Sequence, residues 1–74
     1  MKTGEAIRDV MKIQSITVTQ MAKDLNKSTR LISERLGQEN ISIAKINEML
    51  EKLNYKTVIV PIDTPLPENS YVIE

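Results

Sequence analysis

Three hydroxyl-bearing residues, each followed by apolar side chains at helical spacing, divide most of this chain into short helices. Thr17, Ser28 and Ser42 each stand just before such a stretch. The side-chain oxygen of a residue at this position accepts a hydrogen bond from a backbone N–H of the first helical turn. The sequence therefore predicts a mainly helical fold in which several short helices follow one another.

The spacing of apolar residues by three and four positions predicts four helices. The expected ranges are about 4–13, 18–25, 29–36 and 43–53. The side chains expected to face the core are Ile7, Val10, Met11, Met21, Ala22, Leu25, Leu31, Ile32, Leu36, Ile43, Ile46, Leu50 and Leu53, with Met49 at the edge. Asn26 and Asn54 are expected to end the second and fourth helices and Gly37 the third, since Gly and Asn favour helix ends.

The sharpest expected helix start lies at Thr17. Gln20, three residues later, completes the pattern of a capping box, in which each of the two side chains accepts from the other's backbone N–H. Ile16, just before the cap, can pack on Met21 as a hydrophobic staple. Ile41 and Ile46 stand in the same relation around Ser42.

The carboxy-terminal part of the chain has a different pattern. Thr57, Val58, Ile59 and Val60 form a β-branched run, which predicts a short strand that Pro61 closes or restricts to a sheet edge. Residues 63–70 are expected to be a loop, and residues 71–73 are either a second strand, giving a hairpin, or a loose tail. The expected parts are a helical domain at 1–56 and a strand and tail at 57–74.

The chain has 74 residues and contains neither Cys nor His. Their absence excludes a disulfide framework, a Cys/His zinc site, a thiolate nucleophile and an imidazole base. We expect no enzyme activity, no catalytic residue, no metal, no cofactor and no small-molecule substrate. There is no Phe or Trp to stack on single-stranded bases. No apolar run approaches the roughly 20 residues of a membrane span, so we expect a cytoplasmic protein that does not bind membranes.

The ten basic and ten acidic side chains are unevenly distributed. The first 35 residues carry seven basic and four acidic side chains, and the remaining residues carry three basic and six acidic ones. A basic amino-terminal half can present a surface to phosphates even when the whole molecule is neutral. The alternative is a set of scattered, solvated charges.

The second and third expected helices are joined by about three residues, an arrangement typical of a helix-turn-helix. The second helix of such a pair enters the major groove and contacts base edges from its first residues. The candidates for base contacts are Ser28, Thr29 and Arg30, with Ser33 and Glu34 on the next turn. Arg suits guanine above all. Glu34 is alternatively a solvated or charge-paired residue.

The stretch from Thr17 to Ser33 resembles the helix-turn-helix of the lambda-repressor-like Cro/Xre family. The residues that carry the resemblance are the pair Met21-Ala22, the core position Leu25, the turn at Asn26, the start at Ser28 and the buried Ile32. The similarity covers about residues 4–54, and the stretch 53–61 is similar to small regulators of phages and other mobile elements. The chain departs from the family at Asn26, where Gly is usual, at Lys27, where an apolar residue is usual, and at Val18, where Gln is common.

The resemblance implies a bundle of four to five helices with a short carboxy-terminal strand or hairpin. It implies that Thr29, Arg30 and Ser33 approach base edges. The residues it implies as phosphate contacts are Thr17, Lys27, Gln38 and Asn40, and Lys23 is added on its charge alone.

The expected function is that of a sequence-specific regulator of transcription, a repressor, bound to double-stranded DNA. Since such readers commonly act as dimers on paired half-sites, residues 57–60 are the candidate edge for pairing with a second copy. The alternative is a protein-interaction module on the same scaffold, such as an antitoxin, an anti-repressor or a phage inhibitor. The neutral total charge and the acidic carboxy-terminal half favour this alternative.

Overall fold

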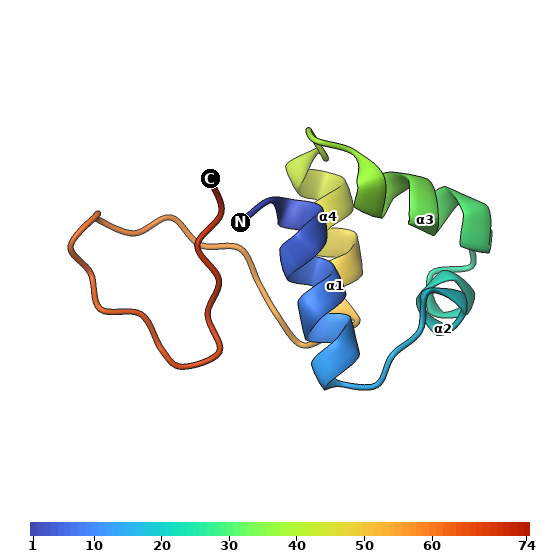
Figure 1. The fold of residues 1–74 in the computed structure, drawn as a ribbon, viewed down its shortest axis with the longest axis horizontal. Helices are drawn as coiled ribbons and strands as arrows, with labels where there is room; N and C mark the ends of the chain where they lie inside the picture. Colours follow the sequence, from blue (N-terminus) through green and yellow to red (C-terminus); the bar gives the residue numbers. More distant parts are fainter.

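Four helices and no strand make up the regular structure of the chain. The computed structural model describes all residues 1–74, and its helices are α1 (Thr3–Ile13), α2 (Val18–Asp24), α3 (Thr29–Gly37) and α4 (Ile43–Glu51). In Figure 1, α1 and α4 lie side by side, α2 and α3 lie on one side of them, and the chain after α4 lies on the other. The prediction of a mainly helical fold is confirmed, with each helix end within two residues of the expected one. None of the four helices has the length and apolar character needed to span a membrane.

The core is aliphatic and is built from all four helices and the segments that follow α3 and α4. Its buried residues are Ile7, Val10, Met11, Met21, Ala22, Ile32, Leu36, Ile41, Ile46, Met49 and Leu53. Leu25 and Leu50 are partly buried against it. Met49 is fully buried, so its placement at the edge was wrong.

Two expected core residues lie outside the core. Ile43 is 64% exposed, because it begins α4 and the inward face of that helix is completed by Ile46 and Met49. Leu31 is 38% exposed, because the buried face of α3 consists of Ile32 and its neighbours one turn later. In both cases an apolar residue lies beside the buried stripe of its helix.

The three predicted hydroxyl caps are all formed. Thr17 Oγ1 accepts from the Gln20 N–H at 3.1 Å, and Ser28 Oγ accepts from the Leu31 N–H at 3.1 Å. Ser42 Oγ accepts from the Lys45 N–H at 3.3 Å. The reverse half of the capping box is absent, because the Gln20 side chain donates to Asp24 Oδ1 at 3.0 Å instead.

Three helices end at a residue with a left-handed backbone. These residues are Ser15, Asn26 and Asn54, with φ of 58°, 56° and 61°. In each case the next N–H donates to the carbonyl five residues back, as in the Lys27 N–H to Ala22 O bond of 2.8 Å. The predictions for Asn26 and Asn54 are confirmed. Gly37 is the last residue of α3, as predicted, but its φ is not positive. It therefore does not form the left-handed helix end that Asn26 and Asn54 form.

The predicted strand at residues 57–60 is not formed. A strand needs a partner for its backbone N–H and C=O groups, and no backbone–backbone hydrogen bond involves residues 56–60. Residues 71–73 do not pair with this run either, so of the two alternatives for these residues the second strand is not formed. The β-branched run is extended chain with exposed apolar side chains.

The end of the chain returns to α1. The Tyr71 hydroxyl donates to Asp9 Oδ2 at 2.7 Å, and this bond raises the pKa of Tyr71 to about 12. The ring of Tyr71 lies 6.4 Å, between centroids, from that of Tyr55, whose hydroxyl donates to Asn69 O at 3.1 Å. The Glu74 N–H donates to Met1 O at 3.2 Å. Residues 55–71 therefore form a loop whose two ends are held together.

Candidate nucleic-acid interface

One face of α3 is exposed and polar along its length. The opposite face carries Ile32, Arg35 and Leu36, which are buried against the body of the molecule. The side chains on the outer face are Thr29, Arg30, Ser33 and Glu34, and Ser28 at the helix start is exposed as well. The structure thus brings together all five residues that the sequence predicts as base contacts. Their types combine hydrogen-bond donors with acceptors, as contacts to base edges require.

The packing of α1 and α2 holds α3 in this position. In Figure 1, α2 is seen almost end-on while α3 lies across the view, so the two helices are steeply inclined to each other. α3 also packs closely against α1: a Cβ atom added at Gly4 would lie 2.0 Å from the backbone oxygen of Leu36. The absence of a side chain at Gly4 lets the start of α1 approach the end of α3.

The carboxy-terminal segment leaves α3 uncovered. Residues 57–74 lie beyond α1 and α4, on the side away from α2 and α3 (Figure 1). The hydrogen bonds of this segment go to α1, to α4 and to the start of the chain, as with Tyr71 to Asp9 and Thr57 to Asn47. The outer face of α3 is therefore not covered by the carboxy-terminal segment.

Arg30 and Glu34 contact each other on the outer face of α3. Arg30 Nε donates to Glu34 Oε1 at 3.1 Å, one helical turn apart, and both side chains are exposed. Exposed pairs of this kind contribute little stability, typically below about 1 kcal/mol. The guanidinium is therefore free to exchange this partner for another hydrogen-bond acceptor.

The expected phosphate contacts surround α3 and do not form a single cluster. Thr17 begins α2 and Lys23 lies in its last turn, while Lys27 occupies the turn before α3. Gln38 and Asn40 follow α3. All are exposed except Lys27, which is half-buried. The hydroxyl of Thr17 accepts the cap bond through its oxygen, so its proton remains available for a phosphate.

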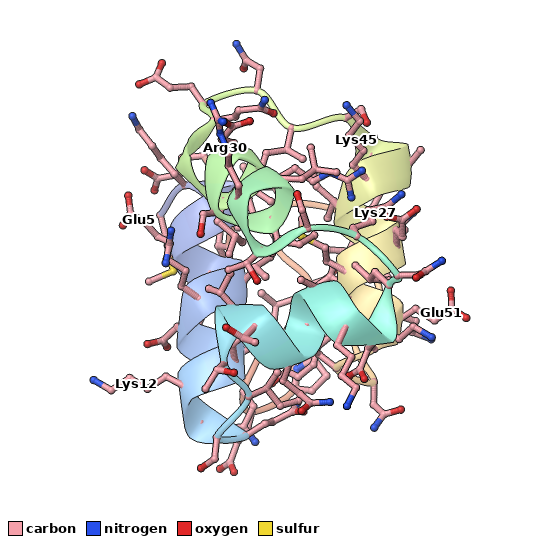
Figure 2. All side chains as sticks on the ribbon, turned by 90° about the vertical axis from the view of Figure 1, so that its right-hand side faces the viewer. Glu5, Lys12, Lys27, Arg30, Lys45 and Glu51 are labelled. Carbon is pink, nitrogen blue, oxygen red and sulfur yellow. The ribbon has the colours of Figure 1, made fainter.

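Two cations that the sequence reasoning did not select lie close to Thr17. Arg8 and Lys12, one turn apart on α1, line a shallow hollow together with Thr17 and Val18. Figure 2 looks onto the end of the molecule formed by α2 and α3, with Lys12 beyond one end of α2 and Lys27 near the other. The sequence contains a pattern that identifies this pair, because Arg8 and Lys12 are four residues apart on an expected helix and so share one face.

Arg35, one of the seven basic residues among the first 35, has a structural role. Its side chain is 8% exposed, and its Nη1 donates to Glu48 Oε1 of α4 at 2.8 Å. Nε of Arg35 is buried without a hydrogen-bond partner. The hydrogen bond from Arg35 holds the pKa of Glu48 below its usual value, with smaller contributions from the charges of Lys27, Arg35 and Lys45. Arg35 thus links α3 to α4 and presents no charge to a ligand.

The Arg35–Glu48 pair makes the stability of the fold depend on pH. Because folding lowers the pKa of Glu48, its contribution is complete above the unfolded pKa of about 4.5 and is lost as the pH falls through the folded value. We expect the difference in unfolding free energy between the wild-type protein and Glu48→Gln to shrink between pH 6 and about pH 3. Urea denaturation at several pH values measures this difference, and a constant difference would contradict the prediction.

A scan against models of known protein families, a search of curated proteins and a search of solved structures each found no match to this chain. No activity is therefore carried over from another protein. Within the structure, no group of three or more His, Cys, Asp or Glu side chains is arranged to hold a metal ion.

Proposed function

We propose that the chain is a sequence-specific, double-stranded-DNA-binding regulator of transcription, a repressor of the lambda-repressor-like Cro/Xre type. The observation that carries this proposal is the outer face of α3, which is exposed and holds Thr29, Arg30, Ser33 and Glu34 together. In this proposal α3 enters the major groove and these side chains contact base edges.

Unpaired cations around α2 and α3 support the proposal through charge. Arg8, Lys12, Lys23, Lys27 and Lys45 form no ion pair within the chain. Free cations of this kind attract the phosphate backbone and make the affinity depend on salt. Thr17 and Ser28 add hydroxyl donors at two helix starts.

The first test is binding to a random-sequence duplex at low salt. We expect measurable binding by fluorescence anisotropy, with an affinity that falls steadily as the salt concentration rises. A selection from a random duplex library should then yield a preferred site. If the protein binds no duplex even at low salt, the proposal loses its electrostatic basis.

On the selected site, Arg30→Ala should weaken binding by about 1–3 kcal/mol, or roughly 10- to 100-fold, if Arg30 contacts a guanine through two hydrogen bonds. The effect should be much smaller on a random duplex, because only phosphate contacts remain there. Lys56→Ala, which removes one positive charge from the carboxy-terminal segment, serves as the matched control. Equal losses on both duplexes would assign Arg30 to the phosphate backbone instead.

We also propose that the active form is a homodimer paired through residues 57–60. Val58, Ile59 and Val60 are exposed, and their backbone groups have no backbone partner within the chain. An unpaired extended segment rich in β-branched residues is suited to strand pairing with another chain. Its position away from α2 and α3 leaves both copies of α3 uncovered (Figure 1).

A protein-interaction module remains the second candidate function. The observation that favours it is the apolar surface of the carboxy-terminal loop, where Ile59 and Ile62 are each 98% exposed. An antitoxin, an anti-repressor or a phage inhibitor would use such a surface to bind its partner. This candidate survives if the protein binds no duplex at low salt, whereas the first does not.

A further inference from the structure

A basic strip lies beside the start of α3, and two segments of the chain, the turn before α3 and the first two turns of α4, contribute to it. Lys27 comes from the turn between α2 and α3, Lys45 from the first turn of α4, and Glu48 from the next turn of α4. Figure 2 shows Lys27 and Lys45 on one side of the start of α3, while Arg30 projects from α3 itself. The strip, defined as Lys27 and Lys45, is therefore next to the face that carries the proposed base contacts.

The arrangement leaves the strip with unbalanced positive charge. One carboxylate of α4, Glu48, lies beside the strip and is bound to the buried Arg35 by the 2.8 Å contact from Nη1 to Oε1. Neither Lys27 nor Lys45 forms an ion pair. Glu48 is close enough to both lysines for their charges to lower its pKa. The cations near Glu48 are thus Lys27, Lys45 and Arg35. Of these, only the buried Arg35 binds the Glu48 carboxylate.

We propose that Lys27 and Lys45 bind phosphates of the DNA strand beside α3, and that Glu48, held in place by Arg35, limits the strength of this sequence-independent contact. This inference rests on the proposed DNA-binding function. A carboxylate next to the strip repels phosphate at every DNA sequence equally. It therefore lowers the affinity for non-specific DNA, while the choice between DNA sequences depends on the outer face of α3.

The test compares variants on a random-sequence duplex over a range of salt concentrations. Lys45→Ala should make the slope of log affinity against log salt shallower by about 0.9, the value for one lost phosphate contact on B-DNA. Lys27→Ala should do the same. Lys56→Ala, which removes an equal charge from the carboxy-terminal segment, should leave the slope unchanged.

Glu48→Gln is the decisive variant, because it should raise the affinity. Gln keeps a carbonyl oxygen that can accept from Arg35 and removes only the charge. The loss of one repulsive charge near a phosphate should tighten binding to the random duplex about fivefold at low salt and progressively less at high salt. A variant made only less stable would bind more weakly, so an increase separates the proposed role from a structural one. Circular dichroism melting confirms that the variant is folded.

The outcomes separate this inference from the function on which it rests. If the wild-type protein binds no duplex, both are overturned. If it binds and Lys45→Ala keeps the wild-type slope, or folded Glu48→Gln binds no tighter, DNA binding stands and the role of the strip is overturned. A shallower slope for Lys45→Ala together with tighter binding by Glu48→Gln supports the inference.

Discussion

Gly4→Ala should unfold a large fraction of the protein, although it adds a single methyl group at a buried position near the start of the chain. The added Cβ would lie 2.0 Å from the backbone oxygen of Leu36 and 3.0 Å from its carbonyl carbon. A backbone atom cannot turn aside as a flexible side chain does, so α1 and α3 must move apart. Overpacking typically costs about 1–3 kcal/mol and occasionally more, and because the overlapped atom is a backbone atom we expect about 3 kcal/mol here.

The expected loss is large in relation to the stability of so small a domain. Cores of chains below roughly 80 residues rarely supply more than about 3–5 kcal/mol. A loss of about 3 kcal/mol should lower the midpoint of thermal unfolding by more than about 12 °C, measured by circular dichroism.

Gly37→Ala is the matched control for this prediction. A Cβ at Gly37 would have no atom within 4 Å, and its φ is not positive. Since Ala favours helices over Gly by up to about 1 kcal/mol, this variant should be as stable as the wild type or slightly more stable. If Gly4→Ala and the wild type have the same midpoint of thermal unfolding, α1 and α3 do not approach this closely.

The features of the fold that were predictable from the sequence are those that depend on neighbours along the chain. The caps at Thr17, Ser28 and Ser42 join residues three positions apart. The left-handed helix ends at Asn26 and Asn54 likewise follow from one residue type. Ser15 adopts the same backbone with no Gly or Asn to signal it.

The features that were not predictable depend on how the helices cross. The sequence gives no sign that Gly4 differs from other helical residues, because its close approach to Leu36 depends on how α3 packs against α1. Arg35 counts as one basic residue among seven until Glu48, thirteen residues later, binds it. The β-branched run at 57–60 has the composition of a strand, but composition supplies no partner and the chain offers none.

The residues of the candidate site likewise fall into those predictable from neighbours along the chain and those that depend on how the helices pack. Helical spacing alone places Thr29, Arg30, Ser33 and Glu34 on the outer face of α3, and the structure has them there. Lys45 was missed because its position near Lys27 depends on where α4 lies relative to the turn before α3. Local pattern therefore identified the proposed base contacts, whereas the charges beside them required the tertiary structure.

The position of Pro61 determines which edge of the carboxy-terminal segment can pair in the proposed dimer. Along an extended strand, successive N–H groups point to alternate edges. Proline has no N–H, so an edge that includes Pro61 lacks a donor. In a strand over residues 57–60, the N–H groups of Val58 and Val60 lie on the other edge, which should therefore face the second copy.

Val60→Pro and Ile59→Pro test this pairing as a matched pair. Each adds one proline to a segment that has no backbone hydrogen bonds within the chain, so neither should unfold the helices. Val60→Pro removes a donor from the pairing edge of both copies, and two partner carbonyls lose their hydrogen bonds. The cost is about 3 kcal/mol per dimer, or roughly a hundredfold in the dissociation constant. Ile59→Pro removes a donor from the edge that faces solvent and should leave the dimer largely intact.

Sedimentation equilibrium at tens of micromolar, without DNA, distinguishes the possible results. A dimeric wild-type protein with a monomeric Val60→Pro and a dimeric Ile59→Pro supports strand pairing through this edge. The opposite order would place the interface on the edge that contains Pro61, and equal dimerisation of both variants would place it outside residues 57–62. A monomeric wild-type protein would overturn the homodimer, and the apolar side chains of Ile59 and Ile62, both 98% exposed, would then be the surface on which to seek a different protein partner.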